Sequence, residues 1–254
     1  MRTIRLVVEY DGTEFHGLQY QPELRTVAGE LQRALTLLMR EPIVVAAAGR
    51  TDAGVHATAQ VVSLHTAGGF PLRRLVPALN AVLPHDLCTR EAEEMPPAFS
   101  ARFSARERHY RYVILNRPER PALLRSRVHH AWHPIDVEVF NGVARSVLGE
   151  RDFRAFCGVL PEQGATVRTL RELRAERRGE TIVIAVRGDG FLHRMVRILI
   201  GTLVEMAQGR RDPAEMAAIL ASRDRRRAGY TAPAAGLYFA GATYEDRTIL
   251  VEPI

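Results

Sequence analysis

The sequence predicts a mixed α/β protein that consists of two subdomains of interleaved strands and helices. Residues 3–10 alternate between two faces with a period of two, which indicates a strand, and the turn signal Asp11-Gly12 follows. From Thr26 onward the apolar residues recur at helical spacing. The same succession begins again after residue 100, so we expect subdomains at residues 1–100 and 101–254, with Pro96-Pro97 at the seam.

The elements of the first subdomain follow from start and stop signals. Thr26 is the expected N-cap of a helix that ends before Pro42. A glycine-bracketed loop, residues 49–54, joins two of the strands. Strands are expected over residues 3–10, 43–48, 60–65 and 87–92, and a short helix over residues 71–82.

The second subdomain shows the same kinds of signal. Asp136 is the expected N-cap of a helix that Gly149 stops. Asp212-Pro213-Ala214-Glu215 has the pattern of a capping box with proline at the first helical position, so a helix should run on to about Ala221. Strands are expected over residues 109–115, 168–176 and 181–187, and a long helix over residues 191–208.

The composition favours a nucleic acid as the partner. Hydrophobic residues make up 46% and charged residues 25% of the 254 residues, which is typical of a globular protein. All 35 basic residues are arginine, which excludes enzymes that need a Walker, Schiff-base or kinase lysine. Guanidinium groups bind phosphates and stack on bases, and the net charge is +6. Surface ion pairs of a heat-adapted host are the alternative explanation.

Several classes of site and segment are not expected. The two cysteines, Cys88 and Cys157, lack the spacing of a zinc site or a disulfide scaffold. The group His129, His130 and His133 suggests a metal, but no carboxylate or cysteine joins it nearby, so we expect neither a metal nor a cofactor. Because no apolar stretch could span a membrane and no signal peptide is present, we expect a cytoplasmic protein.

The strongest candidate for chemistry is the decapeptide at residues 48–57, Ala-Gly-Arg-Thr-Asp-Ala-Gly-Val-His-Ala. Its two glycines bracket Arg50, Thr51 and Asp52, and glycine backbone freedom allows such a loop to hold Asp52 toward a cleft. It is not a phosphate-binding P-loop, because Val55 follows where lysine is required. Taken alone, the loop also fits a purely structural turn.

This decapeptide resembles the catalytic signature of the TruA family of tRNA pseudouridine synthases. Further motifs that resemble the family follow in order over essentially the full chain: Tyr10-Asp11-Gly12-Thr13, Thr26-Val27-x-Gly29-Glu30-Leu31, Asn80-x-x-Leu83-Pro84, Phe103-Ser104-Ala105-Arg106, Tyr110-Arg111-Tyr112, Phe191-Leu192-x-x-Met195-Val196-Arg197, Thr231-Ala232-Pro233 and Gly236-Leu237-Tyr238. The chain departs from the family pattern at Leu18, where tryptophan is usual, and at His193-Arg194, where an aromatic-His pair is usual.

The resemblance implies a pseudouridine synthase fold, in which a mixed sheet is flanked by helices and a central cleft lies between the two subdomains. It implies isomerisation of uridine to pseudouridine in the anticodon stem-loop of tRNA, at nucleotides 38 to 40. It also implies a homodimer in which one tRNA contacts both subunits. No metal, cofactor or nucleotide energy takes part in such an isomerisation.

The resemblance also implies a role for each site residue. Asp52 is the catalytic carboxylate, which acts at the sugar C1′ atom or as a base. Arg197 is the cation that keeps this carboxylate charged; read without the resemblance, it is an arginine that extends to solvent. Tyr110 stacks on the uracil, whereas its place in a strand equally fits a core residue. Arg50 replaces the flipped nucleotide or contacts a phosphate, and Leu237 contacts the substrate.

Two rival functions remain open at this stage. A non-catalytic RNA-binding module would need exposed aromatic residues and arginines, but it would not need the Asp52 loop. A phosphodiesterase or an N-glycosidase would need a metal cluster or a second positioned carboxylate, and the sequence contains no motif for either.

Overall fold

The computed structural model describes residues 1–161 and 165–253, and the chain divides into two compact units. Unit 1 comprises Met1–Arg108 and Tyr238–Ile254, and unit 2 comprises His109–Leu237. The structure confirms the mixed α/β class, with strands and helices in both units. The division differs from the expected one, because it falls after residue 108 and returns residues 238–254 to the first unit.

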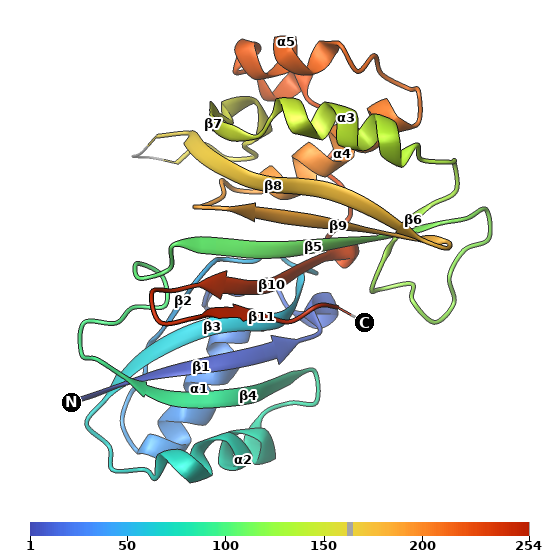
Figure 1. The fold of residues 1–254 in the computed structure, drawn as a ribbon. Coiled ribbons are helices and arrows are strands. Elements are labelled where there is room, and N and C mark those ends of the chain that lie inside the picture. Colours follow the sequence, from blue (N-terminus) through green and yellow to red (C-terminus); the bar gives the residue numbers. More distant parts are fainter. Residues whose placement is uncertain (162–164, 254) are drawn as a thin grey trace. The chain divides into compact units, whose positions relative to one another are not determined.

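Unit 1 is a mixed sheet with two helices. The neighbouring strands follow the order β4-β1-β3-β10, with β2 paired to β3 and β11 paired to β10. Strand β1 is antiparallel to both of its neighbours, whereas β10 is parallel to β3. Figure 1 shows α1 crossing behind the strands of this unit. The elements are β1 (Arg2–Tyr10), α1 (Val27–Met39), β2 (Val45–Ala47), β3 (His56–Thr66), α2 (Leu72–Val82), β4 (Leu87–Met95), β10 (Leu237–Thr243), β11 (Thr248–Leu250) and the 3-10 helix η1 (Gly12–Glu14).

Local signals account for the first elements of unit 1. The hydroxyl of Thr26 accepts a hydrogen bond from the backbone N–H of Gly29, as expected of an N-cap. The apolar face of α1 is buried, and Leu31 and Leu35 are fully enclosed. The helix ends at Arg40, which adopts a left-handed conformation with a φ of 58°.

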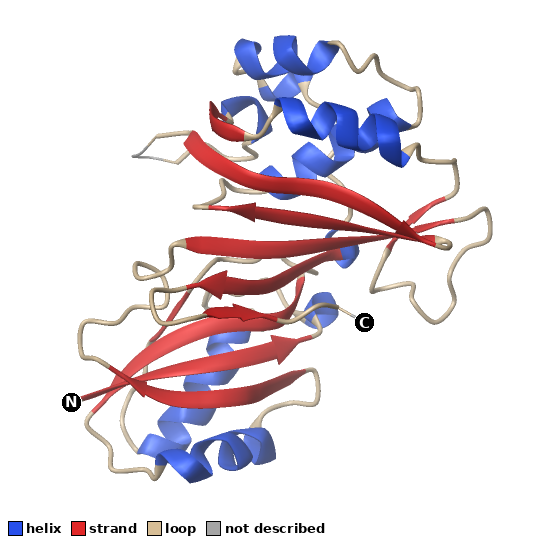
Figure 2. Cartoon of the chain, viewed as in Figure 1, coloured by secondary structure: helices blue, strands red, loops and turns tan. Residues whose placement is uncertain are grey.

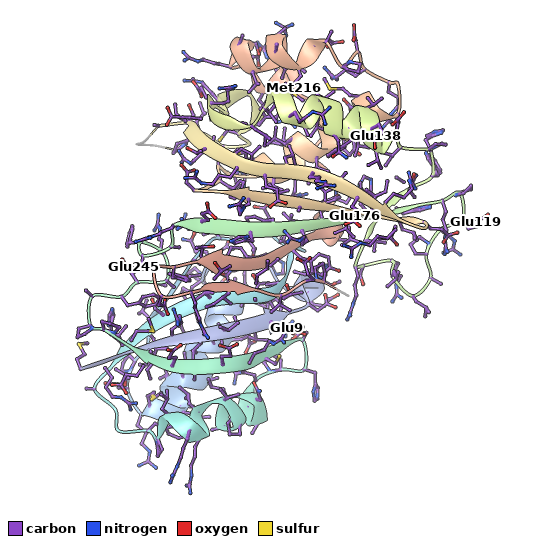
Figure 3. All side chains as sticks on the ribbon, in the orientation of Figure 1. Glu9, Glu119, Glu138, Glu176, Met216 and Glu245 are labelled. Carbon is purple, nitrogen blue, oxygen red and sulfur yellow. The ribbon has the colours of Figure 1, made fainter. Side chains whose placement is uncertain are left out.

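Unit 2 contains strands and, among its described residues, three α-helices. Its strands follow the order β5-β9-β8-β7, and β6 pairs in parallel with β5. Figure 1 and Figure 2 show α3 beside β8 and α5 beside α3. Met216 of α5, which Figure 3 labels, is buried. The elements are β5 (Glu107–Asn116), β6 (His129–Ala131), α3 (Val137–Ser146), β7 (Gly149–Asp152), β8 (Val167–Arg178), β9 (Thr181–Gly188), α4 (Met195–Ala207), α5 (Glu215–Ser222) and the 3-10 helices η2 (Arg154–Phe156), η3 (Arg225–Arg227) and η4 (Ala234–Gly236).

Two helix starts in unit 2 differ from the sequence-based expectation. Helix α4 begins at Met195 rather than near residue 191, because Arg194 has a φ of 58° and cannot continue a helix backward. Asp212 does accept a hydrogen bond from the backbone N–H of Ala214 at 2.9 Å, but α5 begins at Glu215. The Glu215 carboxylate pairs with Arg211 at 3.2 Å, so the carboxylate that the capping box requires forms an ion pair instead.

Within the described residues, every helix is too short or too polar to cross a lipid bilayer.

Candidate active site

The Asp52 loop, residues 48–55, connects β2 to β3 in unit 1. Asp52 is half-buried and Arg50 is exposed, whereas Thr51 between them is buried. The loop turns at Gly54, whose φ of +77° lies in the left-handed region that favours glycine. Arg50 and Asp52 therefore lie on a short connection between two strands, as the sequence predicts.

The backbone of the preceding segment, residues 12–18, holds this loop in place. Leu18 donates its N–H to the Thr51 carbonyl oxygen at 3.1 Å, and Gly54 donates its N–H to the Phe15 carbonyl oxygen at 3.4 Å. Within the loop, Val55 donates its N–H to the Asp52 carbonyl oxygen at 3.2 Å. Main-chain hydrogen bonds thus fix the loop on both sides of Asp52.

Two glycines allow this close approach of the two backbones. A Cβ atom at Gly12 would lie 2.0 Å from the Val55 carbonyl oxygen, which is far inside van der Waals contact. Gly17 has a φ of +90°, and a Cβ atom there would lie 2.9 Å from the Thr51 carbonyl oxygen. Sequence reasoning placed Gly12 in a turn and in the motif Tyr10-Asp11-Gly12-Thr13, and it gave Gly17 no role.

Side chains from β1 and β3 also hold the loop. The Tyr10 hydroxyl lies 2.8 Å from the Thr51 hydroxyl, and Gln60 donates its amide N–H to the Gly49 carbonyl oxygen at 2.9 Å. Burial raises the pKa of Tyr10 to about 12, so its hydroxyl stays protonated at physiological pH. Thr51 is therefore an anchor of the loop, and sequence reasoning missed this role.

The end of the chain returns beside the start of β3. Tyr238 is the register partner of His56, and the two rings stack with their centroids 4.9 Å apart. His56 Nδ1 also lies 3.0 Å from the backbone nitrogen of Gly12, which donates the hydrogen bond. His56 thus links β10 to the segment, residues 12–18, that braces the Asp52 loop.

In unit 2, Arg197 lies half-buried on the first turn of α4. Its Nε donates to the Ala232 carbonyl oxygen at 2.8 Å, and the Ala232 N–H donates to the Arg197 carbonyl oxygen at 3.0 Å. Gly201 permits this packing, because a Cβ atom there would lie 2.0 Å from the Tyr230 carbonyl oxygen. Two hydrogen bonds thus hold the motif at residues 231–233 next to Arg197.

The aromatic candidates of unit 2 are buried. Tyr110 is 6% exposed, and its ring meets the Phe191 ring edge-on at 5.1 Å between centroids. Tyr112 donates its hydroxyl to the Pro233 carbonyl oxygen at 2.9 Å, and burial holds its pKa well above the ordinary value. Leu237, at the start of β10, is 5% exposed. The contact between Phe191 and Tyr110 could not be predicted from the sequence, because we expected Phe191 to be the first residue of a helix.

The predicted residues fall into two sets. Asp52 and Arg50 belong to unit 1, and Tyr110, Arg197 and Leu237 belong to unit 2. Among the described residues, no group of three or more His, Cys, Asp or Glu side chains is arranged to hold a metal ion.

Comparison with known proteins places the chain in a family. A family model described as tRNA pseudouridine synthase matches residues 6–104 and 143–245. A tRNA pseudouridine synthase A from Halalkalibacterium halodurans is 44% identical over 238 residues, which cover 93% of this chain and 90% of that protein. The protein of the same name from Brevibacillus brevis is 43% identical over 237 residues, which cover 93% of this chain and 97% of the relative.

A more distant relative extends the match. A tRNA pseudouridine synthase A from an Enterobacter species is 39% identical over 250 residues, which cover 98% of this chain and 93% of that protein. A solved structure described as a Cbf5-Nop10-Gar1 complex gives a TM-score of 0.34 at 11% identity, over 79% of this chain and 53% of that one, which is too low to support an argument. The sequence identities and the family model agree with the motifs, and the chain belongs to the family of tRNA pseudouridine synthases.

Proposed function

We propose that this protein isomerises uridine to pseudouridine in the anticodon stem-loop of tRNA, at nucleotides 38 to 40, and that Asp52 is the catalytic residue. The observation that carries the proposal is the Asp52 loop. Its main-chain hydrogen bonds with Phe15 and Leu18 fix the backbone around one half-buried carboxylate. A reaction that relies on a single carboxylate needs that carboxylate held in one position.

The chemistry asks two things of the carboxylate. The N1–C1′ bond of the uridine breaks, the detached uracil rotates, and its C5 atom bonds to C1′. An ionised carboxylate can attack C1′ or stabilise the positive charge that develops there, as in glycoside cleavage. It can also accept the proton that C5 loses, while N1 gains a proton, so that atoms and charges balance over the isomerisation.

The residues of unit 2 are proposed to bind the uridine. Tyr110 provides a ring against which the uracil stacks, and stacking stabilises a bound base by about 1–3 kcal/mol. Arg197 provides a positive charge next to the substrate, and Leu237 provides an apolar contact. In unit 1, the exposed side chain of Arg50 is proposed to occupy the space that the flipped nucleotide leaves in the RNA stack.

The substrate and setting rest on composition and on the relatives. The 35 arginines and the net charge of +6 suit a tRNA, whose phosphates supply much of the binding free energy. The matched relatives are named tRNA pseudouridine synthase A. We propose that the protein acts in the cytoplasm as a homodimer, and light scattering at working concentration tests the second statement.

Substitution of Asp52 tests the proposal. We expect Asp52→Asn to lower pseudouridine formation by at least about 1,000-fold, because a neutral amide replaces the ionised carboxylate and can act neither as nucleophile nor as base. The tRNA dissociation constant should stay within about threefold, because phosphate contacts dominate affinity. Glu14→Gln is the matched control: it removes the same charge from an exposed side chain of the bracing segment. Undiminished turnover by Asp52→Asn would exclude Asp52 from the chemistry. If the wild-type protein binds tRNA without modifying it, the protein is a non-catalytic RNA-binding module.

A further inference from the structure

Unit 2 contains a pocket around β6 that the proposed reaction does not use. It has a volume of about 250 Å³, and its walls include His129, Trp132, Gln208, Arg210 and Tyr230. The strand β6 is labelled in Figure 1. Pockets for drug-sized ligands occupy about 300–1,000 Å³, so this one is of a size for a single ring system.

Two buried polar atoms in the pocket wall lack hydrogen-bond partners among the described residues. These are Nδ1 of His129, a side chain that is 8% exposed, and Oε1 of Gln208. The amide nitrogen of Gln208 donates to the His133 carbonyl oxygen at 3.3 Å, which fixes the side chain. Unsatisfied buried polar groups cost free energy, so a ligand that offers hydrogen-bonding groups is favoured once a small movement of the wall opens these atoms to the pocket.

Aromatic packing holds the His129 ring in place. The rings of Tyr112 and Tyr230 meet it edge-on at 5.9 Å and 6.2 Å between centroids. Burial, followed by the charges of His130 and Arg210, lowers the pKa of His129 to about 4, so the ring is neutral at physiological pH. A neutral imidazole and an amide oxygen can each bond to an uncharged polar ring edge.

The rim of the pocket adds a flat surface and a positive charge. Trp132 is 67% exposed, and its indole meets the His133 ring edge-on at 5.7 Å. An exposed indole offers a flat ring face on which a nucleobase can stack. Arg210 is also exposed at the rim and carries a charge that suits a phosphate.

We propose that this pocket binds one unstacked nucleotide of the RNA substrate, with the base on Trp132, its polar edge toward His129 and Gln208, and its phosphate on Arg210. This inference rests on the proposed function for its ligand class, but it concerns binding and not the Asp52 chemistry. Single-stranded RNA is recognised in this way, by stacking on aromatic rings and by hydrogen bonds to base edges.

The single tryptophan of the chain makes the proposal directly measurable. Because Trp132 is the only tryptophan, the tryptophan emission, excited at a wavelength that the seven tyrosines do not absorb, reports on this pocket. Titration with AMP, GMP, CMP and UMP in separate arms should give a saturable change in emission with at least one of them. Inorganic phosphate is the comparison arm, and an equal affinity for phosphate would assign the site to an anion and overturn the nucleotide proposal.

Variants separate the base contact from the phosphate contact. Gln208→Leu should weaken nucleotide binding about tenfold, because the buried acceptor is lost. Arg210→Gln should weaken the monophosphates but leave the corresponding nucleosides unchanged. Arg226→Gln removes the same charge from an exposed side chain elsewhere in unit 2 and serves as the matched control. Its nucleotide affinity should equal that of the wild type.

The role in tRNA binding has its own measurement. Trp132→Leu should raise the KM for tRNA about tenfold and leave kcat unchanged, because loss of a stacked base weakens binding without touching the reacting carboxylate. Asp52→Asn should show the wild-type emission change, so a failure of the catalytic proposal would not affect this result. An emission spectrum that no nucleotide alters, or a Trp132→Leu enzyme with the wild-type KM, would overturn the inference.

Discussion

Gly12→Ala should disable the proposed active site without changing any residue of the Asp52 loop. The added Cβ would lie 2.0 Å from the Val55 carbonyl oxygen, and separations under 3.0 Å are essentially never found. The two backbones must therefore separate by at least about 1 Å. Val55 is hydrogen-bonded to Asp52 through its N–H, so a shift of Val55 displaces the proposed catalytic carboxylate.

The size of the effect follows from this displacement. A misplacement of about 1 Å costs about 100-fold in the rate of a well-oriented reaction, so we expect the single-turnover rate to fall by about that factor. Overpacking costs about 1–3 kcal/mol of stability. For a chain of this length, each kcal/mol lowers the melting temperature by about 2–4 °C. The variant should therefore stay folded at 25 °C while it is nearly inactive.

Other glycines separate contact from backbone strain. Gly69 has nothing within 4 Å of its Cβ position, so Gly69→Ala should change neither stability nor rate. Gly179, with a φ of +62° and open space around it, isolates the conformational strain, and Gly17 combines strain with the contact to the loop.

The assay is single-turnover formation of pseudouridine at saturating enzyme, read together with the melting temperature. Only Gly12→Ala and Gly17→Ala should lose rate, and Gly179→Ala should lose stability alone. A Gly12→Ala enzyme that reacts within twofold of the wild type would refute the view that this glycine fixes the position of Asp52.

Two further predictions concern stability and binding. Arg5 is 1% exposed, and its guanidinium contacts Asp246 and Glu93, both at 2.7 Å. Arg5→Met should therefore lower the free energy of unfolding by about 1–3 kcal/mol. The loss is limited because both carboxylates are half-exposed and remain hydrated in the variant. The hydrogen bond from Arg5 lowers the pKa of Asp246, so this stabilisation is present above the ordinary carboxyl pKa and disappears as the pH falls through the lowered pKa. In urea unfolding, the difference in free energy of unfolding between wild type and variant should therefore become smaller below about pH 4. A difference that does not depend on pH would contradict the pairing. Binding of tRNA should weaken steeply between about 50 and 200 mM salt, as the slope of a filter-binding series will show, and a flat slope would argue against extensive phosphate contacts.

Elements with strong local signals could be predicted from the sequence. Besides α1 with its Thr26 cap, α3 begins where Asp136 predicts, because the Asp136 carboxylate accepts hydrogen bonds from the backbone of Glu138 and Val139 at 2.9 and 3.1 Å. These signals act within four residues, so no tertiary information is needed to read them.

Features that depend on distant partners could not be predicted. The last strands, β10 and β11, return to unit 1 through pairings such as Tyr238 with His56, which lie far apart in sequence and leave no local pattern. The start of α4 was missed because the left-handed conformation of Arg194 is uncommon outside glycine, and the apolar spacing continues across it. The histidines at β6 were considered only as ligands of a metal, which we did not expect, and the pocket was missed because sequence spacing says nothing about burial.

The candidate site shows which part of an active site a motif can reveal. Among the four residues between Gly49 and Gly54, Thr51 faces inward to Tyr10 and secures the loop, while Arg50 is exposed and Asp52 is half-buried. A short loop can divide its work in this way only if neighbouring groups hold it, and a second backbone supplements the support from Tyr10 and Gln60. Here the backbone of residues 12–18 does so, and it can approach closely enough only where Cβ atoms are absent. The glycines at positions 12 and 17 are therefore as much a requirement of the proposed chemistry as the carboxylate, although neither contacts a substrate.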